Sequence, residues 1–253
     1  MDDPRQYSDP SQLNIPYDVV KLPSKGMFYS SKISELKVTY LTASDENVLS
    51  STAIAKSGRM VDELLRRKIF GSDLPITEML DCDKQAILIF LRNTAYGPIY
   101  TFKLTDPKTG DVFDYDHDLS NVEMKEFSLV PNAEGEFEYT LPVSGKIVNF
   151  KFLSSSQEQE LTTLAETYKG GIVPIATKRL ELLIHQIDGE RDKSKISQMI
   201  QTMPIKDSQE FKKFVNLSSP GLNLKVKTKA PGGGNVTTSI VMGADFFRPF
   251  FGL

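Results

Sequence analysis

The sequence predicts an α+β fold in which one unit occurs twice, each copy being a small antiparallel sheet with about three helices. A short phrase appears twice, as LPSKG at 22–26 and as LPVSG at 141–145, and similar residues follow each copy. The order of expected elements is also the same in both halves: two strands, helices, then a hairpin. A hydrophobic content of 40% and a charged content of 25% are typical of a soluble globular protein.

The two halves correspond in sequence order, with an offset that drifts from 112 (Val38 and Phe150) to 124 (Pro107 and Pro231). We interpret the match as an internal duplication. The alternative is that both halves reuse generic turn and capping residues. The other matching pieces are ELLRRKI with ELLIHQI, Asp83-x-Gln85 with Asp207-x-Gln209, TFKL with NLKV, and Pro107-x-x-Gly110 with Pro231-x-x-Gly234.

These patterns divide the chain into three segments. We expect a flexible N-terminal arm at 1–16, a first α+β repeat at 17–140, and a second α+β repeat at 141–253 that ends in an aromatic tail. The arm contains three prolines and too little apolar surface to fold alone.

Helix-start signals and periodicity place the elements. Thr42 and Ser155 each precede an acidic residue by three positions, which indicates a helix N-terminus. In LNLKVKTK the alternation predicts a strand with Lys225, Lys227 and Lys229 outward, where they guard a strand edge or contact phosphate. In the first half we expect strands at 17–21 and 36–41, helices at 45–56, 60–70 and 83–95, and strands at 99–105 and 111–115.

Composition excludes several classes of protein. A net charge of −3 and a pI near 5.6 argue against a dedicated nucleic-acid binder. The single cysteine, Cys82, excludes an intramolecular disulfide framework and a cysteine-rich zinc site. Neither a signal peptide nor a membrane-spanning run is recognisable, so we expect a cytosolic protein.

No group of residues resembles an active site, and we expect no catalytic residues, no cofactor and no metal. Asp114, Asp116, His117 and Asp118 could hold a cation, but their spacing fits no calcium loop and a solvated acidic face is favoured. His185 is expected on a helix face. Acidic neighbours would raise the pKa of the Cys82 thiol, which makes it a poor nucleophile.

The C-terminal sequence DFFRPFFGL is the best candidate for a contact surface. Either its aromatic side chains seal the core of the second half, or they dock into a partner, since aromatic residues and arginine often anchor interfaces. The candidate partner-binding residues are Phe246, Phe247, Arg248, Phe250 and Phe251.

Three stretches carry a resemblance to a known family: LPSKGMFY at 22–29, LKVTYLTASDENVL at 36–49 and MLDCDKQAILIFLRNTAYGPIY at 79–100. They resemble the baseplate hub assembly proteins of T-even-type contractile-tailed bacteriophages. The likeness covers residues 17–165 well and the C-terminal third poorly. Relatives often carry paired cysteines in the hairpin turn, whereas this chain has Asp106-Pro107-Lys108-Thr109-Gly110 there, so a metal-stapled hairpin is not implied here.

The resemblance implies a chaperone for assembly of the baseplate hub in virion morphogenesis, acting through protein–protein contacts. The expected partners are phage baseplate hub proteins, with no nucleic acid, no membrane and no small-molecule substrate. The expected location is the host cytoplasm during assembly or the virion tail baseplate. The alternatives are a stoichiometric structural subunit of the hub and, more remotely, a metal-dependent hydrolase. A duplicated unit could also bridge two related sites on hub subunits.

Overall fold

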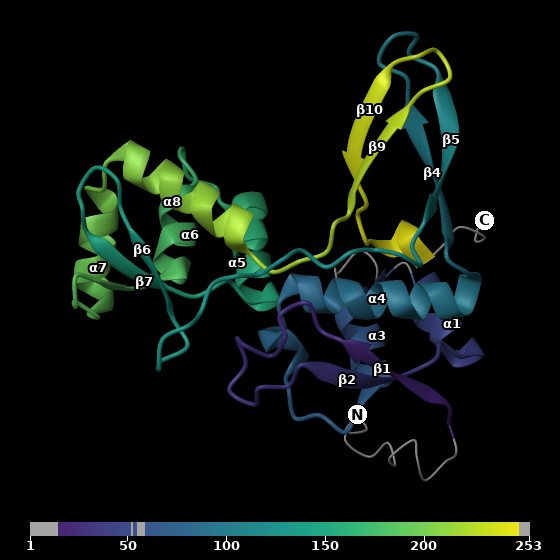
Figure 1. Cartoon of the computed structure of the whole chain (residues 1–253), viewed down its shortest axis with the longest axis horizontal. Coiled ribbons are helices and arrows are strands. Elements are labelled where there is room, and N and C mark those ends of the chain that lie inside the picture. Colours follow the sequence, from purple (N-terminus) through teal and green to yellow (C-terminus); the bar gives the residue numbers. More distant parts are fainter. Residues whose placement is uncertain (1–14, 52, 55–58, 248–253) are drawn as a thin grey trace.

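A computed structural model describes residues 15–51, 53–54 and 59–247, which fold into two lobes (Figure 1). The first lobe contains residues 17–119 and 222–247, and the second lobe contains residues 137–218. Most of the expected N-terminal arm, residues 1–14, lies outside the described residues.

The first lobe packs three helices against a small antiparallel sheet of strand order β1-β2-β3, and a hairpin, β4–β5, follows the last helix. Its elements are β1 (Tyr17–Lys21), β2 (Glu35–Thr39), α1 (Ala43–Ser50), α3 (Met60–Lys68), β3 (Ile69–Phe70), a 3₁₀ turn η2 (Ile76–Glu78), α4 (Asp81–Tyr96), β4 (Ile99–Thr105) and β5 (Val112–Asp118).

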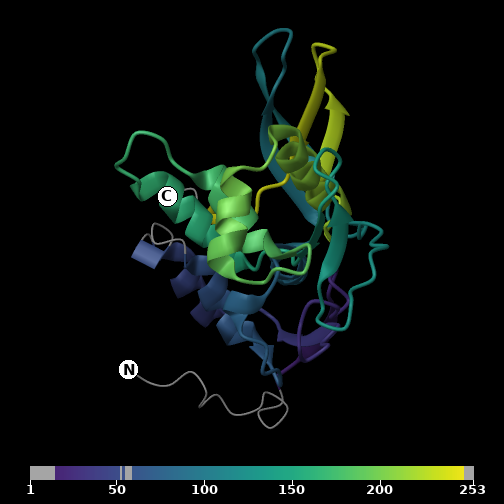
Figure 2. The same ribbon diagram turned by 90° about the vertical axis from the view of Figure 1, so that its left-hand side faces the viewer.

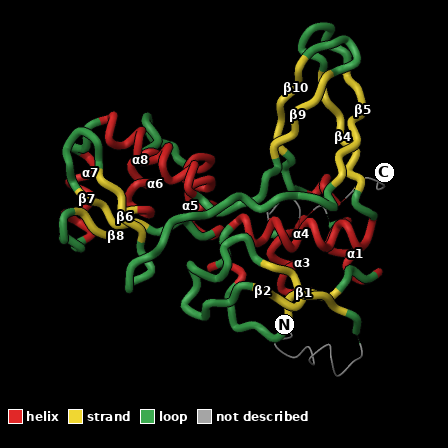
Figure 3. Tube along the Cα trace, in the orientation of Figure 1, coloured by secondary structure: helices red, strands yellow, loops and turns green. Residues whose placement is uncertain are grey.

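The second lobe has the same sheet order, β6-β7-β8, with helices beside it (Figure 3). Its elements are β6 (Phe137–Thr140), β7 (Ile147–Phe150), α5 (Ser155–Thr167), α6 (Ile175–Leu183), β8 (Ile184–Ile187), α7 (Lys193–Gln201) and α8 (Ile205–Ser218). The chain then returns to the first lobe as the hairpin β9 (Lys225–Lys229) and β10 (Asn235–Ser239), followed by the 3₁₀ turn η3 (Ala244–Phe247).

The predicted α+β class is confirmed, and the two halves run through the same order of elements. The second half carries α7 where the first half has only η2, so it has four helices rather than about three. This common order is compatible with a duplication. Within the described ranges, none of the helices combines the length and the apolar character that a membrane crossing requires.

Two stretches that were expected to be helical contain a short strand. The helix expected at 60–70 ends at Lys68, and Ile69–Phe70 form β3. His185, expected on a helix face, lies in β8. The local reason is the same in both lobes: Ile69 pairs with Val38 of β2 and Ile187 pairs with Val148 of β7, so a β-branched residue completes the sheet at this point.

The packing does not follow the expected repeat boundary at 141. The core of the first lobe includes Leu222, Val226 and Ile240 from the end of the chain, together with Phe246 and Phe247. The core of the second lobe is built from residues 137–215. The expectation that the aromatic tail seals the second half is therefore wrong for these two phenylalanines, because both complete the first lobe.

A buried aspartate at the start of α4 holds the first copy of the repeated phrase. Asp83 Oδ1 accepts a hydrogen bond from the Ser24 amide at 2.9 Å, and Oδ2 accepts one from the Tyr29 hydroxyl. The Tyr29 oxygen in turn accepts from the Leu80 amide at 2.9 Å. Because Asp83 and Ser24 are fully buried, these bonds supply partners that water cannot.

Asp207 holds the second copy in the same way from the first turn of α8. Its carboxylate accepts from the amides of Val143 at 2.7 Å and Ser144 at 3.0 Å. The repeated LPxxG phrase thus forms a turn whose amides need a carboxylate, and the repeated Asp-x-Gln supplies it.

The two aspartates differ in their pKa. Burial raises the pKa of Asp83 above its ordinary value of 3.8, and its hydrogen bonds oppose that rise only in part. Burial also favours a higher pKa for Asp207, but the hydrogen bonds from Val143 and Ser144 outweigh this effect and lower the pKa below its ordinary value.

We predict opposite pH dependences for the Asp83→Asn and Asp207→Asn variants. Because the folded state raises the pKa of Asp83, the advantage of wild type over Asp83→Asn grows as pH falls through that raised pKa toward 3.8. Because it lowers the pKa of Asp207, the advantage over Asp207→Asn is full above 3.8 and shrinks as pH falls below it. Urea unfolding at several pH values measures the free energy of unfolding of each variant. If the difference from wild type changed with pH in the same way for both variants, the assignment would be contradicted.

The larger change Asp83→Ala removes the acceptor of the buried Tyr29 hydroxyl. It should lower the free energy of unfolding by about 2–4 kcal/mol.

Candidate partner-binding surfaces

The predicted aromatic anchors begin inside the first lobe. Phe246 and Phe247 have no exposed surface, and their rings meet edge to face at 5.2 Å. Partner contacts by these two residues would require η3 to leave the core. Arg248, Phe250 and Phe251 lie outside the described residues, so their predicted role stays a prediction.

Arg92 of α4 explains why the chain end returns to this lobe. Its guanidinium carbon lies 4.9 Å from the Tyr100 ring centre and 5.6 Å from that of Phe246. Two of its nitrogens donate to the carbonyls of Gly97 at 2.8 Å and Ile99 at 3.0 Å. Burial lowers the pKa of this guanidinium, and the ring faces compensate for part of the lost hydration. The isolated arginine in an apolar helix was the available signal in the sequence, and it was missed.

The lobes meet through an aromatic junction that sequence reasoning also missed. Phe28, just after the LPSKG turn, packs edge to face on Phe127 and Phe152, each at 5.4 Å, and lies 5.5 Å from Phe137. A backbone hydrogen bond of 2.9 Å from the Ser155 amide to the Met79 carbonyl joins the lobes beside it. Phe28 and Phe152 pack against both cores, so they link the two lobes.

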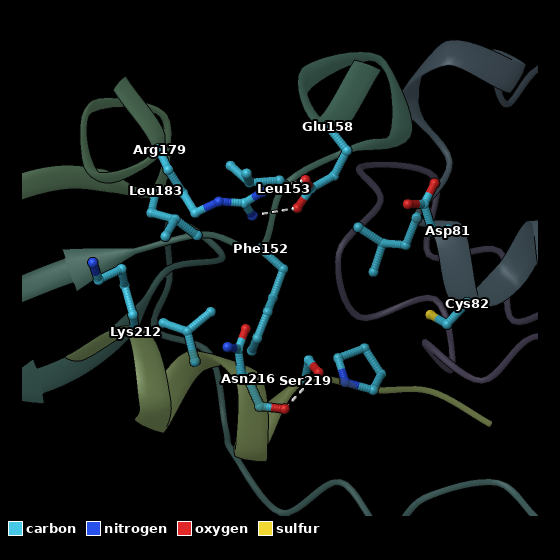
Figure 4. Close-up of a pocket in the computed structure, with 13 residues that line it drawn as sticks. Asp81, Cys82, Phe152, Leu153, Glu158, Arg179, Leu183, Lys212, Asn216 and Ser219 are labelled. Carbon is cyan, nitrogen blue, oxygen red and sulfur yellow. Dashed lines mark hydrogen bonds and ion pairs between the residues drawn. The ribbon is translucent and has the colours of Figure 1, made fainter. Parts of the chain in front are cut away.

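Beside this junction lies a cleft of about 530 Å³ between the N-terminus of α4 and helices α5, α6 and α8 (Figure 4). Its floor is apolar, with Phe152, Leu153 and Leu183. Glu158 and Arg179 form a two-pronged ion pair across one wall, with both bonds at 2.7 Å. The cleft therefore combines an apolar floor with charged side chains along its wall.

Removal from water raises the pKa of two acidic groups at the cleft. Burial, and secondarily the charge of Asp83, raise the pKa of the Cys82 thiol, which disfavours the thiolate that nucleophilic attack needs. Partial removal from water, and then the charge of Glu158, raise the pKa of Asp81 at the cleft mouth.

The acidic group in DYDHDL is divided between two sides of β5. Asp114, Asp116 and Asp118 are exposed, whereas His117 is half-buried on the other side. Asp116 accepts from the Thr101 hydroxyl at 2.6 Å. Over the part of the chain that the structure describes, no three His, Cys, Asp or Glu side chains gather closely enough to hold a metal ion.

The two hairpins stand side by side on α4 (Figures 1 and 2). Their tips are joined by Asp106, which is fully buried and accepts from the Gly232 amide at 2.8 Å and from the Lys108 amide at 2.8 Å. The matching Pro-x-x-Gly turns in the sequence mark these two tips, although their contact could not be read from spacing. The Asp106 carboxylate thus joins the two tips.

The comparison with protein families gives a match. The model of the family described as T4 bacteriophage base plate protein matches residues 15–248, nearly the whole chain. No curated protein and no solved structure matches the chain.

We predict that Phe246→Ala destabilises the chain by about 3–5 kcal/mol, because it empties a packed site beside Arg92. Ile172→Ala is the matched control, since Ile172 is 89% exposed, and should change the free energy of unfolding by less than about 0.5 kcal/mol. Urea unfolding followed by circular dichroism measures both. Unchanged stability of Phe246→Ala would instead favour a role at an interface.

A second prediction concerns the joined tips. A Cβ at Gly234 would meet Asp106 and come within 2.8 Å of Pro107 Cδ, so Gly234→Ala must push the tips apart. We expect a loss of about 1–3 kcal/mol. Gly171→Ala, which meets nothing within 4 Å, is the control. In an Asp106→Ala background the Gly234→Ala change should have a smaller effect on unfolding, and full additivity would contradict the contact.

Proposed function

The chain belongs to the T4 bacteriophage base plate protein family, and we propose that within the phage tail baseplate it acts as an assembly factor of the central hub. The family match over residues 15–248 supports a role in the baseplate, and the likeness of residues 22–29 and 79–100 to hub assembly proteins is the ground for the narrower role. The partners would be hub proteins of the baseplate, contacted during virion morphogenesis in the host cytoplasm. The proposed activity is binding, without a catalytic step.

The surfaces of the molecule support a binding role. Two lobes of similar element order present similar sheets and helices to their surroundings, and the cleft between them combines an apolar floor with charged walls. A partner segment in the cleft would contact both lobes at once. Once it is bound to one lobe, its effective concentration at the other lobe is raised. Arg248, Phe250 and Phe251 are the proposed additional anchors.

A structural subunit of the hub is the second candidate. The family description as a base plate protein favours it, and the same cleft and lobe surfaces would serve a permanent contact. The two candidates differ in one consequence: a subunit stays in the finished particle, whereas an assembly factor leaves it.

Quantitative mass spectrometry of purified particles and of the producing lysate separates them. We predict abundance in the lysate, bound to tail intermediates, and absence from finished particles. A few fixed copies per particle would establish the structural subunit instead. Absence from both particles and tail intermediates would overturn a role in the baseplate.

A further inference from the structure

The two hairpins form a sandwich with oppositely charged outer faces. Exposure alternates along all four strands, and the covered side chains Tyr100, Phe102 and Tyr115 of β4–β5 pack against the core cluster that contains Val226 of β9. The two hairpins lie side by side (Figure 2), so the exposed side chains of each hairpin belong to an outer face of the pair. One side carries Lys225, Lys227 and Lys229, and the other carries Asp114, Asp116 and Asp118.

The two charged rows have the same spacing. Alternate residues of an antiparallel strand lie about 6.8 Å apart on one face. Each row has three charges at that repeat, so a lysine row laid on an aspartate row can pair at every position. The residues beside the lysines on β10 are the small Asn235, Thr237 and Ser239, which leave the lysine row prominent.

The charges of both rows are available to a partner. The three lysine side chains make no hydrogen bond or ion pair to any described residue. Asp116 and Asp118 each use one carboxylate oxygen, toward Thr101 and Ser120, and leave Oδ2 unbonded among the described residues. Lys103, which pairs across the strands with Asp114, reduces the charge of the acidic face without cancelling it.

The acidic face also carries apolar contacts at its ends. Ile99 is 50% exposed at one end of the β4–β5 face and Val112 is 61% exposed at the other. They flank the aspartate row, and a partner that covered this face would remove their apolar surface from water.

We propose that the outer face of β9–β10 docks on the outer face of β4–β5 of a second copy of this chain. The contact joins two different faces, so it is head-to-tail and leaves one free face at each end of a pair. Further copies can add to those faces and close a ring or extend a row. This inference is independent of the proposed function in assembly.

The predicted association is weak and sensitive to salt. Each face is a single hairpin wide, well below the roughly 800 Å² per partner of a standard interface. We therefore expect a dissociation constant between about 1 μM and 1 mM. The Debye screening length falls from about 10 Å at 0.1 M salt to about 3 Å at 1 M, so the association should weaken strongly over that range of salt concentration.

A charge-swap experiment tests the proposal on the full chain. One variant, Asp114→Lys with Asp116→Lys, makes both faces basic; Asp118 is kept because it binds Ser120. The other, Lys225→Glu with Lys227→Glu, makes both faces acidic. Sedimentation equilibrium at low salt should show concentration-dependent association of the wild type, at least about tenfold weaker association of each variant alone, and restored association in their equimolar mixture.

The control is Lys169→Glu with Lys193→Glu, which makes the same change in net charge as Lys225→Glu with Lys227→Glu, but on exposed residues of the second lobe. It should associate like the wild type, and circular dichroism should show all variants folded. A monomeric wild type at every concentration would overturn the proposal. So would variants that associate undiminished, or an equimolar mixture that stays monomeric.

Discussion

Each lobe depends on a carboxylate that accepts hydrogen bonds from the backbone of a turn. Asp83 and Asp207 occupy the first turn of α4 and α8. About sixty residues earlier in the chain, an LPxxG turn donates one amide to Asp83 and two amides to Asp207. A buried amide without a partner destabilises a fold by about 1–3 kcal/mol. The bond therefore fixes the turn, the sheet that follows it and the helix as one unit.

The arrangement of the lobes follows from that bond in the first half. By holding the turn at 22–26, Asp83 also directs Phe28 into the aromatic junction with the second lobe. The cleft lies next to this junction, so its shape depends on the same turn. The two hairpins are held together by a separate interaction, because Asp106 joins their tips far from both LPxxG turns.

Much of the fold could be predicted from local patterns. The helix start predicted at Thr42 forms a capping box, whereas the start predicted at Ser155 is capped one residue earlier by Ser154. The strand alternation in LNLKVKTK holds in β9. Predictions that depended on long-range contacts were less successful. The short strands that begin at Ile69 and Ile184 form because they pair with β2 and β7. In the sequence, the spacing of apolar residues continues with helical periodicity through both strands, so a local pattern predicts helix there.

The candidate site shows the same limit. That DFFRPFFGL holds buried aromatic residues could be anticipated, but the lobe they enter is decided by Arg92 and Tyr100, which lie about 150 residues earlier. The cleft joins residues from 80 to 220, and no local pattern connects them. Spacing along a sequence indicates which residues share a helix or strand face; it does not indicate which faces meet.

Amide hydrogen exchange at the two turns is the most direct test of this account. If buried carboxylates hold the repeated phrase in both lobes, the amides of Ser24, Val143 and Ser144 should exchange as slowly as paired amides of the neighbouring sheets. Exchange at the rate of open loops, at either turn, would contradict the claim that one interaction organises both lobes.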